Sequence, residues 1–459
     1  MTLSSSKEPL IAPASGFVTE QTMALLTDLY ELTMARSYLR GGRNEPSTFD
    51  LFVRSLPPRR GFLVSAGLDT VLTYLERVRF SDGAIAYLRT LHLFDEAFLR
   101  YLRTFTFTGD VRAIPEGEVV FPPEPLLEIT APRIDAQIVE TFLLNQINFQ
   151  TMVASKAARI VLAARGRSVV DFSPRRDHGT DAAMKVARCS YLAGCAGTSN
   201  VLAGMAYGIP VSGTMAHSYV MSFDDELEAF RAYARHFPEH CLLLIDTYDT
   251  VQGARNAAIV AAELQARGHR LRGVRLDSGD LADLSHKVRR ILDDAGFPSV
   301  RILASGDLNE DKIRDLLDAN APIDMFGVGT EMGVSYDAPA LGGVYKLVED
   351  TRGYRIKRST GKVTLPGRKQ VWRVSRDGQM VEDVIALHDE PAPAGARPLL
   401  AEVLRGGTRI WSESLEDGRQ RCRDRMASLP AVLRMLDAAR NPVALSGKLE
   451  ALRCQMSSR

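Results

Sequence analysis

The spacing of hydrophobic positions divides the chain into stretches with different expected structures. Between residues 22 and 40, Leu25, Leu29 and Leu32 recur at intervals of three to four, which predicts a helix with one apolar face. Elsewhere apolar and polar residues alternate, which predicts strands. Up to residue 165 we expect a helix at 22–40, a strand in "STFDLFVRSL", helices within 67–104, strands joined by turns in "FTGDVRAIPEGEVVFPPEPLLEIT" and a long helix at 134–165.

From about residue 168, short apolar runs alternate with helical segments. The runs are "SVVDFS", "IPVSGTMA", "CLLLIDTYD", "RGVRLDSGD", "VRILASGDLN" and "DMFGVGTEM", and the helices between them are expected at 178–193, 223–236, 250–267, 280–295 and 309–318. Strands that alternate with helices indicate βα units and a parallel sheet. The near-even spacing favours a (β/α) barrel, and a strand count nearer six or seven than eight makes that barrel irregular.

The alternation stops after about residue 344. Three segments then have the pattern of antiparallel strands: "GGVYKLVED", "YRIKRSTGKVTLPGRKQVWRV" and "QMVEDVIALHD". We expect them to pack with the N-terminal strands. The predicted protein is therefore α/β, with a flexible tail at 1–20, a discontinuous α+β sandwich domain at 21–150 and 345–430, an irregular α/β barrel with the active site at 151–344, and a helical extension at 431–459.

Composition and charge narrow the range of partners and compartments. The 57 Lys and Arg residues nearly balance the 56 Asp and Glu residues, and a formal charge of +1 argues against binding to nucleic acid or an anionic membrane. The five cysteines form no CxxC pair, which favours plain buried thiols in a reducing compartment. No apolar stretch approaches the roughly 20 residues that span a bilayer, and the N-terminus lacks the apolar core of a signal peptide. We therefore expect a cytoplasmic location.

The ends of the expected parallel strands are unusually polar. In an α/β barrel these carboxyl ends carry the active site, so the polar turns should converge on one mouth. The residues concerned are Arg175, Arg176, Asp177 and His178, then His217, Asp246 and Asp249, then Arg275, Asp277 and Asp280, then Ser305, Gly306 and Asp307, and finally Gly327 and Gly329.

The residue types at these ends favour a phosphorylated sugar and a metal ion. Arginine binds phosphate or carboxylate bidentately, and aspartate beside glycine suits ribose hydroxyls or Mg²⁺. The Gly306-Asp307 and Gly327-Val328-Gly329-Thr330 turns leave backbone N–H groups for a phosphate. The imidazole of His217 can serve as base or nucleophile, although a lone histidine is more often a hydrogen-bonded structural residue.

Eight motifs in one order resemble the nicotinate phosphoribosyltransferase family, a group of type II phosphoribosyltransferases. They are "TDLYELTM" (27–34), "FSPRRDHGTDAA" (172–183), "GTSNVLAG" (197–204), "SGTMAHS" (212–218), "RLDSGDL" (275–281), "GVGTEM" (327–332), "GGVYKLVE" (342–349) and "KRSTGKVTLPGRKQVWR" (357–373). The resemblance, which runs from about residue 22 to about residue 430, implies a (β/α)-type enzyme of NAD biosynthesis. It would transfer the 5-phosphoribosyl group of phosphoribosyl pyrophosphate to nicotinic acid, with nicotinate mononucleotide and pyrophosphate as products.

The resemblance also implies how the reaction is driven. Family members couple the transfer to ATP hydrolysis through a phosphorylated histidine, and His217 is the residue that matches it. Mg²⁺ on the pyrophosphate is expected, although no metal ligand is assigned. The residues that match the catalytic group are His217, Asp277, Arg275 and Asp249.

Substrate contacts carry over from the same motifs. For nicotinate they are Tyr30, which would reach in from the partner subunit of a homodimer with shared active sites, and Phe172, Arg175, Arg176 and Ser199. For the phosphoribosyl and pyrophosphate groups they are Arg54, Arg275, Asp277, Ser278, Gly306, Asp307, Gly329, Thr330 and Lys346. Ordinary core aromatics, surface arginines, salt bridges and turn residues are the alternatives to these roles.

The sequence differs from the family motifs at one place, and three other functions are alternatives to nicotinate phosphoribosyl transfer. Ser173-Pro174 stands where the family often has glycine after the phenylalanine, and proline stiffens the loop that carries Arg175. Nicotinamide phosphoribosyltransferase has an aspartate where Ser199 stands here, and an aspartate would repel a carboxylate ligand. Quinolinate phosphoribosyltransferase would need more basic residues for its second carboxylate. A catalytically silent binding protein on the same scaffold would be expected to have lost part of the catalytic set.

Overall fold

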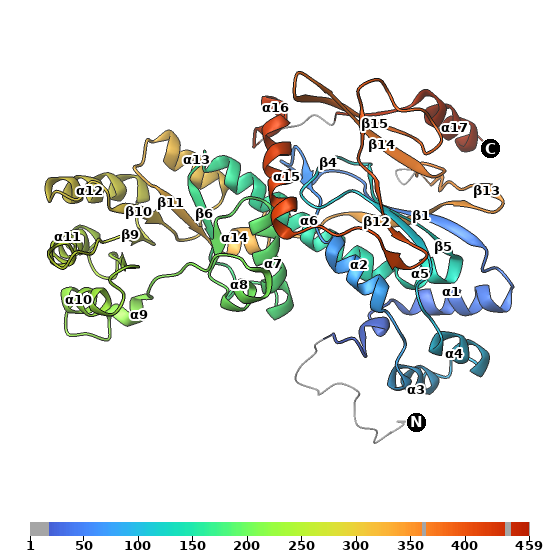
Figure 1. The fold of residues 1–459 in the computed structure, drawn as a ribbon, viewed down its shortest axis with the longest axis horizontal. Helices are drawn as coiled ribbons and strands as arrows, with labels where there is room; N and C mark the ends of the chain where they lie inside the picture. The colour runs from blue at the N-terminus through green and yellow to red at the C-terminus, as the bar shows by residue number, and fades with distance from the viewer. Residues whose placement is uncertain (1–17, 360–363, 437–441, 459) are drawn as a thin grey trace.

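The computed structural model describes residues 18–359, 364–436 and 442–458. Most of the tail predicted at 1–20, and residues 360–363 of the last family-like motif, lie outside this part of the chain. The described residues form a mixed α/β protein with a parallel sheet, at the left in Figure 1, and separate, mostly antiparallel sheets, at the right.

The parallel sheet has six strands in the order β7-β6-β11-β10-β9-β8. All neighbouring pairs are parallel. The strands are β6 (Ser168–Asp171), β7 (Gly197–Thr198), β8 (Leu242–Leu244), β9 (Gly273–Leu276), β10 (Arg301–Ala304) and β11 (Met325–Val328). The predicted irregular barrel is thus a curled half-barrel in which β7 and β8 are the edge strands of the described sheet.

One predicted strand is wrong. "IPVSGTMA" (209–216) forms only an isolated bridge between Val211 and Thr198, so the sheet gains no strand there. Pro210 offers no N–H to a neighbouring strand, which weakens regular pairing in this segment. The two-residue β7 pairs with β6 instead.

Helices follow the parallel strands, and polar residues at the strand ends begin several of them. They are α7 (Thr180–Leu192), α8 (Val201–Tyr207), α9 (His217–Val220), α10 (Glu226–His236), α11 (Thr250–Ala266), α12 (Leu281–Asp294), α13 (Glu310–Asp318) and α14 (Thr330–Gly333). Asp249 accepts a hydrogen bond from the backbone of α11, and Asp280 accepts two from α12. Both aspartates are therefore helix N-caps, which stabilise the first turn.

The largest sheet joins strands from the two ends of the chain. Its order is β13-β12-β1-β5-β3-β17-β18. The strands are β1 (Pro46–Val53), β3 (Asp110–Ala113), β5 (Pro125–Pro132), β12 (Gly343–Asp350), β13 (Gly353–Tyr354), β17 (Ala401–Arg405) and β18 (Thr408–Arg409). N-terminal β1 lies between N-terminal β5 and C-terminal β12, antiparallel to both. The domain boundaries and the sandwich packing stay predictions.

The remaining strands form two smaller sheets. One has the order β16-β14-β15-β19, with β14 (Lys369–Arg376), β15 (Gln379–Leu387), β16 (Arg397–Pro398) and β19 (Val443–Leu445), and the other pairs β2 (Leu63–Val64) with β4 (Val119–Val120). Because β19 pairs with β15, the extension predicted as helical also contains a strand. Its described helices are α16 (Ala431–Arg434) and α17 (Gly447–Ser457), which follow α15 (Leu415–Ser428).

The N-terminal helices match the expected pattern with one shift. The helix predicted at 22–40 is a short 3₁₀ turn, Met23–Leu25, followed by α1 (Leu29–Arg40). The pattern at 67–104 gives α2 (Leu68–Arg77), α3 (Asp82–Thr90) and α4 (Glu96–Arg103), and that at 134–165 gives α5 (Arg133–Ile138) and α6 (Glu140–Ala163). Among the described helices, none is long and apolar enough to cross a membrane.

The long helix α6 contacts both halves of the protein, including α7, α13 and β12 (Figure 1). Its Lys156 ammonium lies 2.5 Å from the Glu310 carboxylate at the start of α13 and 2.9 Å from Asp337, which follows α14. Arg60 also pairs with Asp337, at 2.6 Å. Lys156, Arg60 and Glu310 are almost fully buried, and this ionic cluster links the N-terminal elements with the half-barrel. Removing one partner would leave an uncompensated buried charge, which is strongly destabilising.

Candidate active site

His217 lies at the carboxyl edge of the parallel sheet, facing the loops after β8 and β9. Its Nε2 atom is 3.8 Å from Asp277 Oδ2, and its Nδ1 atom is 3.2 Å from Thr247 Oγ1. About a third of each of the His217 and Asp277 side chains is exposed, so solvent or a ligand can reach both. The structure therefore brings together two of the residues that the sequence predicts to be catalytic.

Hydrogen bonds connect the loops that follow three neighbouring strands. Asp246, after β8, accepts from the Asp277 backbone N–H at 2.9 Å and from the Ser278 hydroxyl at 2.6 Å. Ser305, after β10, donates to Asp277 Oδ1 at 2.5 Å. These bonds hold Asp277 and Ser278 at the same edge as His217, as the sequence predicts.

Arg275 is the next-to-last residue of β9 and lies beside this group. Its Nη1 atom donates to Thr214 Oγ1 at 2.7 Å, and its Nε atom is 4.0 Å from Asp277 Oδ1. The pKa of the Arg275 guanidinium is lowered, because burial outweighs the charges of Asp277 and Asp246, which raise it. Among the described residues, both Arg275 Nε and Asp246 Oδ1 are buried without a hydrogen-bond partner, so each retains a bonding position that a ligand could use.

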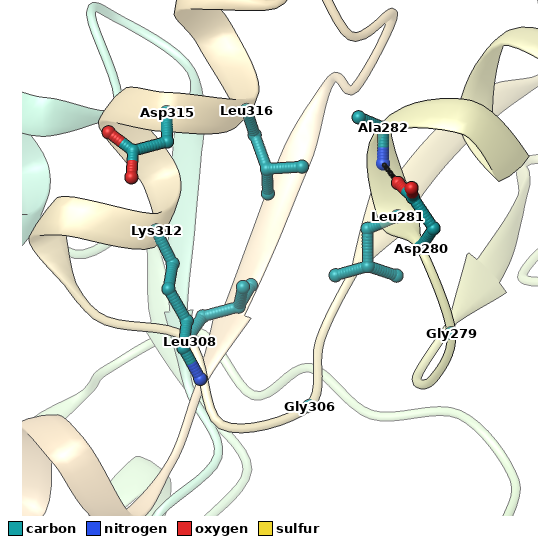
Figure 2. Close-up of a pocket in the computed structure, with 9 residues that line it drawn as sticks. All are labelled: Gly279, Asp280, Leu281, Ala282, Gly306, Leu308, Lys312, Asp315 and Leu316. Carbon is teal, nitrogen blue, oxygen red and sulfur yellow. Dashed lines mark hydrogen bonds between the residues drawn. The ribbon is translucent and has the colours of Figure 1, made fainter.

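The turn at Gly306 packs directly on the backbone of Asp277. Gly306 has φ +93°, and a Cβ atom at this position would lie 2.1 Å from the Asp277 carbonyl oxygen. Beyond it, Lys312 Nζ donates to the Asp307 carbonyl at 2.8 Å. This turn borders a pocket of about 420 Å³ between the starts of α12 and α13. Gly279 and Asp280 form the opposite side of this pocket (Figure 2). The turn thus combines a close backbone approach with an adjoining open space.

Phe172 and the Gly327–Thr330 turn form another part of the same edge. The Phe172 N–H donates to Val328 O at 2.8 Å, and a Cβ atom at Gly327 would lie 2.4 Å from the Phe172 ring. Gly329 precedes Thr330, the first residue of α14. The glycine at 327 therefore leaves the space that the ring occupies.

The loop after Phe172 carries two exposed arginines, Arg175 and Arg176. Ser199, half-buried, lies on the neighbouring β7 side, where its N–H donates to Asp171 O at 2.8 Å. This places the two arginines and Ser199 on adjacent loops, β6 to α7 and β7 to α8. Their contacts with nicotinate stay predictions.

Three predicted site residues lie on the other half of the chain. Tyr30, in the first turn of α1, is half-exposed; its burial and the nearby Glu140 carboxylate raise the pKa of its phenol. Lys346 lies on β12, and Arg54 follows β1. Burial raises the pKa of Glu140, and the charge of Lys346 offsets part of that rise. In Figure 1, α1 and the half-barrel strands β9 and β10 lie at opposite ends of the long axis. Tyr30 therefore lies far from His217 within one copy.

Two neighbours of the site, Thr247 and Thr214, were not singled out from the sequence, whereas Asp246 was expected at the mouth without an assigned role. Thr247 contacts His217, Thr214 binds Arg275, and Asp246 fastens the Asp277 loop. Asp246 and Thr247 stand at the end of the apolar run "CLLLIDTYD", so the strand-end signal was present for both. Within the described ranges, no three His, Cys, Asp or Glu side chains gather into a group that could hold a metal ion.

Comparisons with known proteins identify the family. Residues 25–148 match the model of the nicotinate phosphoribosyltransferase N-terminal domain, and residues 167–347 match that of the nicotinate phosphoribosyltransferase family. A similar protein is nicotinate phosphoribosyltransferase pncB2 of Mycobacterium tuberculosis, 50% identical over 93% of this chain and 92% of its own length. The chain belongs to the nicotinate phosphoribosyltransferase family. The family enzyme of Bacillus subtilis is 44% identical over 81% of this chain and 77% of its own length.

Solved structures of the family agree with the fold. Human nicotinic acid phosphoribosyltransferase has a TM-score of 0.84 at 31% identity, covering 94% of this chain and 99% of its own. Nicotinate-nucleotide pyrophosphorylase from Pyrococcus furiosus has a TM-score of 0.75 at 25% identity, covering 92% and 98%. This chain therefore shares its curled parallel sheet and separate sheets with the human enzyme.

Proposed function

We propose that this protein transfers the 5-phosphoribosyl group of phosphoribosyl pyrophosphate to nicotinic acid, forming nicotinate mononucleotide and pyrophosphate in NAD biosynthesis. The observation that carries the proposal is the facing pair His217 and Asp277, 3.8 Å apart, with Arg275 beside Asp277. This group lies at the carboxyl edge of parallel strands, where α/β enzymes bind their substrates. Its retention argues against a silent binding protein.

The chemistry asks the protein to position two substrates and to stabilise a leaving group. The pyridine nitrogen attacks C1 of the ribose as pyrophosphate departs, and C1 becomes cation-like, as in other glycosyl transfers. Arg275 supplies positive charge at the pyrophosphate, and Asp277 with Ser278 binds the ribose. The Gly306–Asp307 and Gly329–Thr330 turns hold the 5′-phosphate, while Arg54 and Lys346 assist at the pyrophosphate.

ATP coupling belongs to the same proposal, with His217 as the phosphorylated residue. The side-chain contacts favour Nε2 as the phosphoryl acceptor, since Nδ1 lies next to Thr247 whereas Nε2 faces Asp277 across 3.8 Å. A phosphoryl group on Nε2 would lie at the edge where pyrophosphate departs. Because the phosphohistidine and the departing pyrophosphate would lie at the same edge, phosphorylation of His217 by ATP could influence the transfer step.

Mg²⁺ fits the carboxylates of this edge. The ion usually retains several waters and binds through one or two carboxylates together with substrate phosphates, so a complete protein cage is not required. Asp246 Oδ1 lacks a hydrogen-bond partner among the described residues. Asp246 and Asp249 both follow β8, and Asp277 follows the neighbouring strand β9. These aspartates would hold Mg²⁺, which neutralises charge on pyrophosphate when bound.

A homodimer with shared active sites completes the proposal. Tyr30 is half-exposed and lies far from His217 in its own chain, so a second copy would have to supply its ring (Figure 1). Beside the arginine loop, α8 exposes the apolar side chains of Val201, Leu202 and Met205, which are 71%, 55% and 79% accessible. An apolar group of this kind supports a subunit contact next to the site.

Two further proposals concern the organisation and location of the chain. Residues 21–150 and 345–430 form one discontinuous domain, which is supported by the shared sheet of β1, β5 and β12. The protein works in the cytoplasm, which is supported by four buried free thiols, Cys189, Cys195, Cys241 and Cys422.

Substrate choice gives the first test. We expect kcat/KM for nicotinate to exceed that for nicotinamide by at least about 100-fold, because Arg175 and Arg176 attract a carboxylate and Ser199 does not repel it. The measurement is chromatographic detection of the mononucleotide product with phosphoribosyl pyrophosphate and Mg²⁺, with and without ATP. Comparable kcat/KM values for the two substrates would favour the nicotinamide enzyme instead.

A further inference from the structure

Two carboxyl groups share one hydroxyl beneath the loop that carries Arg175 and Arg176. Asp171, the last residue of β6, is fully buried, and Asp177 lies on the far side of the loop. Ser173 Oγ lies between them, 2.6 Å from Asp171 Oδ1 and 3.0 Å from Asp177 Oδ2. Both distances are within the range of O–H···O hydrogen bonds.

This arrangement requires one proton more than the serine supplies. A serine hydroxyl carries one hydrogen, so it donates to only one of two ionised carboxylates. In the second contact, the Ser173 oxygen and a carboxylate oxygen would then face each other with no hydrogen between them, and the two would repel. A proton on one of the carboxyl groups removes the conflict, because that carboxyl donates to Ser173 while Ser173 donates to the other.

The hydrogen bonds assign the proton to Asp177. Asp171 accepts three hydrogen bonds: from Ser173 Oγ, from the Ser173 N–H at 2.9 Å and from Thr198 Oγ1 at 2.7 Å. Burial raises the pKa of Asp171, and these donors offset part of that rise by stabilising its carboxylate. Asp177 has the Ser173 contact alone, and its Oδ1 atom is buried without a hydrogen-bond partner among the described residues. Burial, followed by the charge of Asp171, raises the pKa of Asp177 to about 6.

Asp177 also packs against the helix that begins at the Gly329–Thr330 turn. A Cβ atom at Gly333 in α14 would lie 2.0 Å from Asp177 Oδ1, so the carboxyl group rests on this backbone. The charged groups that act on Asp177 are Asp171 on β6 and His178 in its own loop. The neighbours from α14 and β7 are uncharged: Gly333 at Asp177 and Thr198 at Asp171.

We propose that protonated Asp177 is a positioning residue that donates a hydrogen bond to Ser173 and thereby holds the arginine loop against α14. The inference rests on the proposed function, because Arg175 is there expected to bind the carboxylate of nicotinate. When Asp177 loses its proton to solvent, two carboxylates face one hydroxyl and the loop is held less firmly. The KM for nicotinate therefore rises as the pH rises through the Asp177 titration, while kcat changes little.

The test compares three proteins over a range of pH. Between about pH 5.5 and 8, the KM of the unaltered protein is expected to rise by about fivefold, the equivalent of one hydrogen bond. Asp177→Asn retains an N–H donor for Ser173 at every pH, so its KM stays low and nearly constant. Asp177→Ala lacks the donor and starts from the high KM even at acidic pH. The control is Asp181→Asn, an exposed carboxylate paired with Lys185 on α7, which should reproduce the unaltered profile.

A second readout is independent of the substrate. Because the folded-state pKa of Asp177 is raised, the stability that its proton contributes is full below the unfolded pKa and is lost as the pH rises through about 6. The thermal midpoint of the unaltered protein should therefore fall relative to that of Asp177→Asn as the pH rises. Parallel profiles of both KM and thermal midpoint for these two proteins would overturn the inference. Diverging thermal midpoints without any nicotinate turnover would support the Asp177 bridge and contradict the proposed function.

Discussion

At the scale of single residues, Gly306 explains how two loops of the site come into contact. Its φ of +93° lies in the region that favours glycine, and no side-chain atom fits between it and the Asp277 carbonyl. The contact links the turn expected to bind the 5′-phosphate with the loop expected to bind the ribose. A side chain at this position would force one of the two loops to move.

The first prediction concerns this position. Gly306→Ala should lower kcat/KM for phosphoribosyl pyrophosphate by roughly 10- to 100-fold, because small displacements of positioning groups have large effects on rate. Steady-state kinetics with varied phosphoribosyl pyrophosphate measure it. Gly296→Ala is a matched control, since Gly296 has φ +87° but no atoms near its absent Cβ. Equal losses in the two variants would mean that backbone strain, not the contact with Asp277, is responsible.

Polar residues at the strand ends predicted part of the site from the sequence alone. Asp277, Ser278 and Arg275 lie together as expected, because parallel strands end at a common edge. His217 also lies at this edge, although the segment before it forms no strand. Asp249 and Asp280 stand in equivalent positions, yet each also caps a helix. Helix capping and ligand binding both favour aspartate at a strand-to-helix turn, so sequence alone does not separate the two roles.

At the scale of elements, hydrophobic spacing predicted the helices and most strands because their burial follows the spacing. Strands β8 to β11 coincide with apolar runs, and helices α11 and α12 start within a residue of their expected positions. The two-residue β7 has no such run, and its neighbour "IPVSGTMA" has an apolar run without regular pairing. No regular strand extends the described sheet beyond β7, although the apolar run in "IPVSGTMA" predicts one.

The buried ionic cluster is an element-scale feature that has no local sequence signal. Lys156 lies in the middle of α6, whereas Glu310 begins α13 and Asp337 follows α14. These residues are far apart in the chain, and each alone has the appearance of an ordinary surface charge. Their pairing depends on how α6 packs against the half-barrel, which only the three-dimensional structure provides.

At the scale of the whole molecule, the separation of Tyr30 from His217 makes the subunit arrangement a functional question. If each site uses Tyr30 from the other chain, two differently impaired variants can complement one another. Mixed dimers of Tyr30→Ala and Asp277→Asn would contain one site with both native residues. If Tyr30 acts within its own chain, no site in the mixture is complete.

The corresponding prediction is recovery on mixing. After unfolding and refolding together, or co-expression with two tags, the two inactive variants should regain about a quarter of the native rate, because random pairing gives half mixed dimers with one intact site each. Product formation per milligram measures the recovery, and each variant treated alone is the control. No recovery in a preparation that contains mixed dimers would contradict the shared site.

The proposed function depends most on His217, which lies at the common edge of the parallel strands and is proposed to couple ATP hydrolysis to phosphoribosyl transfer. The most direct measurement is the rate of nicotinate mononucleotide formation by His217→Ala with and without ATP, beside His240→Ala, which removes an exposed histidine elsewhere. We expect His217→Ala to retain slow transfer that ATP no longer stimulates, and His240→Ala to respond to ATP as the native protein does. Full ATP stimulation in His217→Ala would contradict this role of His217.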